Sequence, residues 1–208
     1  MGICLPAYAG EGILNPHDAR TDKPGSEKIG PAEGRPLSGA RWGAGFAAVG
    51  RFVSEIEAAA ANKGQLRPGY VLAGDEIFLL DRCRASVLKA FVPPELKDFC
   101  LADLDLSSTS IFEVLDQAQT PSLMAPFQVI FVRNVRLLYT RGAKKDEFAA
   151  LKRYFSSPNP QALLIFVADF LRIPSDTRRM ELDDKNRFER LTETLGEYCG
   201  MVELARVN

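Results

Sequence analysis

Beyond Pro68 the sequence alternates between short apolar runs and segments with helical periodicity, and this alternation restricts the chain to few folds. Five runs rich in branched and aromatic residues lie at 70–73, 99–106, 129–132, 163–168 and 201–205. Between them, apolar residues recur every three or four positions, as they do along one face of a helix. Strands that alternate with helices form parallel sheets buried on both faces. We therefore predict an α/β fold with a five-stranded, mostly parallel sheet and flanking helices.

The helices themselves are predicted from the same spacing. Apolar residues repeat with a helical period over about 80–91, 148–155 and 188–198. A further helix is expected to begin after Ser110, because Ser110 and Glu113 have the spacing of a capping box. In that motif the Ser oxygen accepts a hydrogen bond from one free backbone N–H, and the Glu carboxylate accepts one from another.

The first 45 residues differ in composition from the rest. They contain 9 of the 16 Gly and 5 of the 13 Pro, so the other 163 residues hold 7 Gly and 8 Pro. We expect residues 1–45 to be a poorly ordered leader and residues 46–208 to form one domain. Apolar residues at helical spacing from Phe46 to Ala60 predict that the domain opens with a helix. That helix should end near residues 62–64, where Gly64 can adopt the left-handed conformation of a cap.

Charge and the histidine count exclude several classes of protein. The 26 Lys and Arg nearly balance the 27 Asp and Glu, which excludes a strongly basic nucleic-acid arm and an acidic tail. The single histidine, His17, lies in the predicted leader, so the domain holds no Ser-His-Asp triad and no His-ligated metal site. The four cysteines have no C-x-x-C spacing, and Cys83 and Cys100 lie in apolar runs, where thiols are usually buried.

No targeting or membrane segment is expected. The chain contains no apolar run near the roughly 20 residues that span a bilayer. Its first six residues lack the basic and apolar regions of a secretory signal. We therefore expect a cytoplasmic protein without a membrane partner.

The first predicted strand leads into a helix through Gly74, Asp75 and Glu76, where a nucleoside triphosphatase would carry its phosphate loop. That loop needs the pattern G-x-x-x-x-G-K-[ST] to hold phosphate and magnesium. The last three places of the pattern are held here by Leu79, Leu80 and Asp81. Acidic residues at this point would repel phosphate, whereas Asp75 suits a helix N-terminus as a cap.

Two other nucleotide signals also fail. The strand that ends at Asn134 is not followed by the acidic residue that would hold magnesium. The segment 43–48 matches G-x-G-x-x-A, but no predicted strand precedes it, as a dinucleotide site requires. We therefore expect a nucleotidase-like sheet without a phosphate loop, a bound cofactor or a metal.

Two charged groups leave alternatives open. Asp103 and Asp105 occupy alternate positions of a strand, so they either serve acid–base catalysis together or form a solvated strand end. Basic residues cluster at Arg178, Arg179, Lys185, Arg187 and Arg190. Because acidic residues are interleaved with them, the cluster is either an ordinary solvated face or a contact with an acidic protein or nucleic acid.

Residues 121–126, the proline turn, lie between a predicted helix and a predicted strand. Pro121 and Pro126 bracket Leu123 and Met124 and keep them out of a long helix. Apolar side chains on a short, rigid turn suit insertion into a groove on a partner, since little conformational entropy is lost on binding. The alternative is that Leu123 and Met124 simply cap the core.

The combined pattern resembles the N-terminal domain of the delta subunit of bacterial DNA polymerase III, a clamp-loader subunit that opens the sliding clamp. The resemblance covers about residues 46–207. It is carried by the segments 52–56, 69–76, 79–80, 120–124, 129–134, 154–160 and 163–169. Their order and spacing together are more specific than any one of them.

The resemblance implies a AAA+-like sheet that binds no ATP and catalyses no reaction of its own. It implies clamp binding through Ser122, Leu123 and Met124, although the family often has Leu-Phe where this chain has Leu123 and Met124. The implied partners are the sliding clamp (the beta subunit) and other loader subunits, with DNA reached only through the complex. The DNA-directed DNA polymerase activity, a nucleotidyltransferase reaction, belongs to that complex.

Two departures from the family accompany the resemblance. Its members continue into a helical lid and a collar domain, whereas this sequence ends at Asn208, so we expect a fragment, a truncated gene product or a shortened relative. Residues 1–45 match nothing in the family, so we expect either a disordered extension or a misassigned start. The alternative function is that of an α/β enzyme that acts on a small molecule through Asp103 and Asp105.

Overall fold

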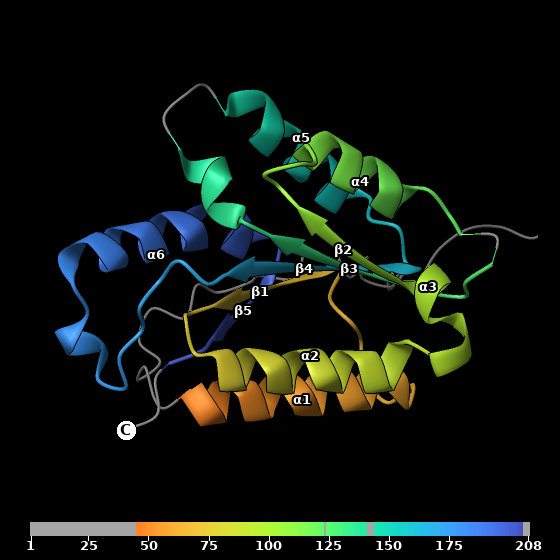
Figure 1. The fold of residues 1–208 in the computed structure, drawn as a ribbon, viewed down its shortest axis with the longest axis horizontal. Coiled ribbons are helices and arrows are strands. Elements are labelled where there is room, and N and C mark those ends of the chain that lie inside the picture. The colour runs from red at the N-terminus through yellow and green to blue at the C-terminus, as the bar shows by residue number, and fades with distance from the viewer. Residues whose placement is uncertain (1–44, 123, 141–143, 206–208) are drawn as a thin grey trace, which may run out of the picture. The chain divides into compact units, whose positions relative to one another are not determined.

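The computed structural model describes residues 45–122, 124–140 and 144–205 (Figure 1). The predicted leader, residues 1–45, lies outside the described residues apart from Gly45. The described part contains a five-stranded sheet with the strand order β2-β3-β4-β1-β5. The strands are β1 (Gly69–Ala73), β2 (Leu101–Asp105), β3 (Gln128–Arg133), β4 (Ala162–Ala168) and β5 (Gly200–Glu203). Every strand pairing is parallel, so the predicted fold class is confirmed and the sheet is all parallel.

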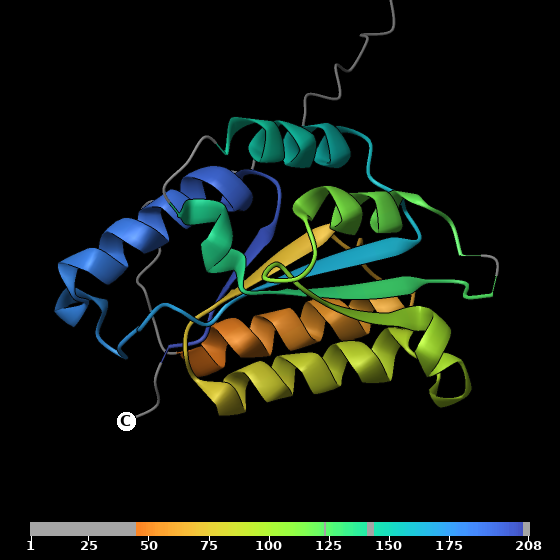
Figure 2. The same ribbon diagram turned by 45° about the horizontal axis from the view of Figure 1, so that its top comes forward.

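Helices cover both faces of this sheet (Figures 1 and 2). The α-helices are α1 (Gly45–Ala60), α2 (Ile77–Phe91), α3 (Lys97–Cys100), α4 (Ile111–Gln119), α5 (Lys145–Ser156) and α6 (Leu182–Thr194). Short 3-10 helices are η1 (Pro94–Leu96), η2 (Val135–Tyr139), η3 (Thr177–Arg179) and η4 (Leu195–Glu197). Helices α1 and α2 pack on one face, and α4, α5 and α6 pack on the other.

The two faces form two apolar layers because side chains alternate along each strand. In β1, Tyr70 and Leu72 pack with α1 and α2, whereas Val71 and Ala73 pack with the helices of the opposite face. All residues of β1 and β4 are buried. Two covered faces explain why these strands read as continuous apolar runs rather than alternating ones.

Local signals predicted most elements, but several boundaries differ. The helix predicted over 188–198 is α6, which begins at Leu182 and ends at Thr194, followed by η4. Two further errors concern particular residues. The first helix ends in a Schellman motif whose left-handed residue is Asn62, at φ +54°, and not Gly64. The N–H of Lys63 donates to the carbonyl of Ala58, and the N–H of Asn62 donates to that of Ala59. Asn takes this role because its short polar side chain tolerates the left-handed region.

The second error concerns the start of the strand predicted over 99–106. Phe99 lies in α3 and is half exposed, and β2 begins only at Leu101. Pro93 and Pro94 precede it; the rigid backbone of proline suits Pro94 to the first turn of η1, which leads into α3. The capping box at Ser110 and Glu113 is confirmed, with both of its reciprocal hydrogen bonds present.

None of the helices in the described residues combines the length and the apolar character needed to cross a bilayer.

Candidate functional site

The proline turn connects α4 to β3. It lies at the side of the sheet where the amino ends of the parallel strands are found. Helix α4 is held against the sheet by its buried side, which carries Ile111, Val114, Leu115 and Ala118. Its last turn is fixed by the Asn159 side chain, which donates a buried hydrogen bond of 2.9 Å to the carbonyl of Ala118. The start of the turn is therefore fixed by the packing of α4 on the sheet and by the hydrogen bond from Asn159.

Within the turn, one side chain organises the backbone. The hydroxyl oxygen of Ser122 accepts hydrogen bonds from the backbone N–H of Ala125 at 3.0 Å and of Met124 at 3.3 Å. Ala125 is buried, and the ring of Phe127 packs on Phe91 with 5.0 Å between the ring centroids. These contacts attach the turn to the protein on the side that leads into β3.

The three predicted site residues differ in their exposure to solvent and in whether the structure describes them. Met124 exposes 62% of its surface, so it does not cap the core. Ser122 is half-buried, and its oxygen accepts the two hydrogen bonds from the backbone of the turn. Leu123 lies outside the described residues. The described part of the turn therefore consists of an exposed, flexible apolar side chain on a hydrogen-bonded backbone, which can occupy an apolar groove of a partner.

The end of β1, where a phosphate loop would begin, is packed against other strands. Gly74 has a φ of +136° and donates its N–H to the carbonyl of Ala168 at 3.1 Å. A Cβ atom at this position would overlap the backbone carbonyl of Leu204. The glycine thus permits a close approach between β1 and the segment after β5, a different role from admitting a phosphate group.

The acidic residues after Gly74 differ slightly from expectation. Glu76, and not Asp75, occupies the N-cap position of α2, and its side chain makes no capping hydrogen bond. Asp75 instead lies 3.8 Å from the guanidinium of Arg172. The reason is the extended backbone at Glu76, which delays the first helical residue to Ile77.

Asp103 and Asp105 have separate partners. Both carboxylate oxygens of Asp103 accept hydrogen bonds from Arg84, at 2.8 and 2.6 Å. This pairing holds the pKa of Asp103 below its usual value. Asp105 accepts hydrogen bonds from Ser107 and from the Asn134 side chain, and these lower its pKa to about 2.

The chemistry of the two carboxylates follows from these contacts. Both groups are ionised at neutral pH, so neither can donate a proton as a general acid. A carboxylate whose pKa is lowered is also a weaker general base. The described contacts therefore weigh against the acid–base interpretation. Within the described residues, no three His, Cys, Asp or Glu side chains are grouped to hold a metal ion.

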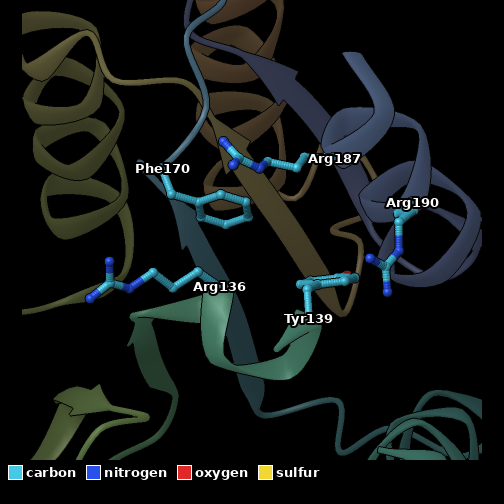
Figure 3. Close-up of a pocket in the computed structure, with 5 residues that line it drawn as sticks. All are labelled: Arg136, Tyr139, Phe170, Arg187 and Arg190. Carbon is cyan, nitrogen blue, oxygen red and sulfur yellow. The ribbon is translucent and has the colours of Figure 1, made fainter. Parts of the chain in front are cut away.

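The basic cluster predicted between residues 178 and 190 is divided by the fold. Arg178 and Arg179 belong to η3, and their exposed side chains both lie near Asp176. Arg187 and Arg190, from α6, instead line a pocket of about 480 Å³ (Figure 3). The other lining residues, which sequence reasoning missed, are Arg136, Tyr139 and Phe170. They follow the carboxyl ends of β3 and β4, where ligands of such sheets commonly lie, and that position could have identified them.

Comparisons with known proteins agree on one family. Residues 70–197 match the family described as DNA polymerase III, delta subunit. DNA polymerase III subunit delta from Bacillus subtilis (strain 168) is 28% identical over 152 residues, which cover 71% of this chain and 40% of that protein. The solved structure of the Bacillus subtilis DNA clamp loader delta protein is similar with a TM-score of 0.55 and 26% sequence identity, covering 75% of this chain and 43% of that one. The chain thus spans about two fifths of the length of each relative.

Proposed function

Because this chain belongs to the DNA polymerase III delta-subunit family, we propose that it acts in DNA replication as a clamp-loader subunit that binds the sliding clamp. Residues 46–208 would be the AAA+-like N-terminal domain of such a subunit. The match over residues 70–197 supports this, because it runs from β1 to η4 and includes the proline turn. Its further partners would be the other loader subunits. The complex would act in the cytoplasm.

The clamp contact is proposed to be the apolar pair Leu123 and Met124. The observation that carries the proposal is the exposure of Met124, at 62%, on a turn held by Ser122 and by the buried Ala125. A methionine that is already displayed to solvent needs no rearrangement before it enters a groove. Its burial would remove apolar surface from water, which stabilises the complex.

Clamp opening would then follow from differential affinity. A subunit that binds the open form of the ring more tightly than the closed form shifts the ring toward the open form by that difference. No bond is made or broken in this step, and ATP would be hydrolysed by partner subunits. The close packing of Gly74 against Leu204 supports this division, since it leaves the end of β1 without the geometry of a phosphate loop.

The proposal is tested by titrating the 208-residue protein against purified sliding clamp. Leu123→Ala combined with Met124→Ala should cost roughly 2–4 kcal/mol of binding free energy, the scale of an interface hot spot. The matched control is Ile77→Ala with Phe78→Ala, which also removes two exposed apolar side chains, from α2. Unchanged affinity in the first variant, or an equal loss in the control, would contradict the assignment of the site.

A further inference from the structure

Met124 differs from the other described methionines in its exposure to solvent. It exposes 62% of its surface on the proline turn. Met180 and Met201 are half-buried and pack against the apolar layer on the α4–α6 face of the sheet. A Cβ atom at Gly196 would lie only 3.4 Å from the sulfur of Met201, so that sulfur has a close neighbour. Met1 lies outside the described residues. An oxidant in solution therefore reaches Met124 more readily than Met180 or Met201.

The turn keeps Met124 exposed because its backbone is attached to the protein beside that residue. The N–H groups of Met124 and Ala125 donate to the Ser122 hydroxyl oxygen at 3.3 and 3.0 Å. Ala125 is buried, and the ring of Phe127 packs on Phe91. Since the exposed Met124 side chain contributes little to the core, a chemical change at its sulfur should leave the fold intact.

The described thiols do not compete with Met124 for an oxidant. Cys83, Cys100 and Cys199 are buried, and burial raises the pKa of each. Peroxides oxidise the thiolate form, so these three thiols stay unreactive while the fold is intact. The thioether of methionine has no ionisable proton, and its reaction therefore depends on access rather than on a pKa.

We propose that Met124 is a reversible oxidation site at which peroxides weaken the clamp contact, an inference that rests on the proposed function. In the reaction, the O–O bond of hydrogen peroxide breaks, one oxygen atom bonds to the Met124 sulfur, and the other leaves as water. The sulfur is oxidised by two electrons and the peroxide is reduced by two. A methionine sulfoxide reductase reverses the change with two electrons from a pair of thiols, which become a disulfide as water is released.

The added oxygen changes what Met124 can do in a groove. Methionine is a flexible apolar side chain, whereas its sulfoxide is polar and disrupts apolar contacts. An oxygen that accepts hydrogen bonds from water loses them when it enters an apolar groove, and this loss costs free energy unless the groove supplies a donor. We therefore expect the protein oxidised at Met124 to bind the sliding clamp about tenfold less tightly.

The first measurement needs no clamp and so does not depend on the proposed function. The 208-residue protein is treated with hydrogen peroxide, and peptide mapping by mass spectrometry follows each methionine with time. Every protein carries Cys4→Ser, which removes the thiol outside the described residues. Met124 should be oxidised faster than Met180 and Met201, with thermal unfolding unchanged. Equal rates at the three positions would overturn the proposal.

The second measurement is a titration of the treated protein against purified sliding clamp. Oxidation should lower the affinity about tenfold, and methionine sulfoxide reductases A and B, which act on the two sulfoxide epimers, should restore it. Met124→Leu keeps an apolar side chain of similar volume and should bind equally well before and after peroxide. The matched control, Met180→Leu with Met201→Leu, keeps Met124 and should lose affinity on oxidation as the natural sequence does.

The outcomes separate this inference from the proposed function. If the untreated protein binds the clamp and the protein oxidised at Met124 binds equally well, this inference alone is overturned. The same holds if Met124→Leu loses as much affinity on oxidation as the natural sequence, because the damage would then lie elsewhere. If the untreated protein does not bind the clamp, the proposed function fails and this inference fails with it.

Discussion

The backbone carbonyl of Leu204 lies against Gly74, in the space that a side chain at position 74 would occupy. The contact is part of the sheet, because the N–H of Leu204 donates to the carbonyl of Ala73 at 2.7 Å. Gly74 also has a φ of +136°, which residues with a side chain rarely adopt. The close approach of the Leu204 carbonyl and the positive φ of Gly74 both occur where the end of β1 packs against the segment after β5.

Gly74→Ala is therefore expected to destabilise the protein. The strained backbone alone costs of order 1–3 kcal/mol, and the overlap with a backbone carbonyl adds to it. Denaturant unfolding followed by circular dichroism measures the change. Gly50→Ala is the matched control, since Gly50 lies inside α1 with open space around it. That substitution should stabilise the protein by roughly 0.5–1 kcal/mol, and a similar loss in both variants would contradict this account.

Ser122→Ala is expected to weaken clamp binding more than it weakens the fold. The substitution removes the oxygen that accepts from the N–H groups of Met124 and Ala125, so Met124 would lose its fixed position before binding. The expected loss of binding free energy is about 1 kcal/mol, the worth of one intramolecular hydrogen bond.

Calorimetric titration against the clamp measures this change. Ser122→Thr keeps the acceptor oxygen and should retain most of the affinity. Ser156→Ala, which removes an exposed hydrogen bond that a serine hydroxyl donates to the carbonyl of Lys152, away from the turn, should have no effect on binding. If Ser122→Ala binds as tightly as the natural sequence, the turn does not need this support.

The Arg84–Asp103 pair is expected to stabilise the fold in a pH-dependent way. Because the pKa of Asp103 is lower in the folded protein than its ordinary value of 3.8, the pair stabilises the fold above that pH. The contribution is lost as the pH falls through the lowered pKa. About a third of each side chain is exposed to water, so we expect a coupling of only about 1 kcal/mol at neutral pH.

A double-mutant cycle with Arg84→Gln and Asp103→Asn measures the coupling at neutral and at acidic pH. The control cycle uses Arg178 and Asp176, where the Arg178 side chain is 90% exposed. That pair should couple by less than about 0.5 kcal/mol. A coupling that persists well below the pKa of Asp103 would show that the pair contributes through packing and not through charge.

The buried cysteines are expected to resist modification in the folded protein. Burial raises the pKa of Cys83 to about 12 and raises the pKa values of Cys100 and Cys199 as well, so all three remain protonated near pH 8. The thiolate is the reactive form. Peptide mapping after iodoacetamide treatment should find these positions modified only in denaturant, with glutathione as a reactive reference. Rapid labelling of Cys199 in the native protein would contradict its burial.

Much of the fold could be predicted from local patterns along the chain. The continuous apolar runs of β1, β3 and β4 and the capping box at Ser110 each depend on residues close together in sequence. The errors occurred where two local solutions compete. Asn62 and Gly64 can both end a helix, and the choice between them depends on how the chain must turn to reach β1.

The candidate site was only partly predictable for a different reason. The prolines predicted a rigid turn with an apolar pair, but the exposure of Met124 depends on what surrounds the turn after folding. The pocket joins η2 to α6, so that Tyr139 is hydrogen-bonded to Thr194, 55 residues away. No periodicity in either segment records that contact.

The sequence by itself determined the class of the fold, the place of most strands and helices and the likeness to clamp-loader delta subunits. It could do so because hydrophobic periodicity and capping are properties of neighbouring residues. Only the tertiary structure decided which polar groups are paired: Asp103 with Arg84, and Asp105 with Asn134. The same packing left Arg136 and Arg190 without a carboxylate of the described residues within ion-pair distance. Such pairings depend on distances between elements, which arise only when the sheet brings separate segments together.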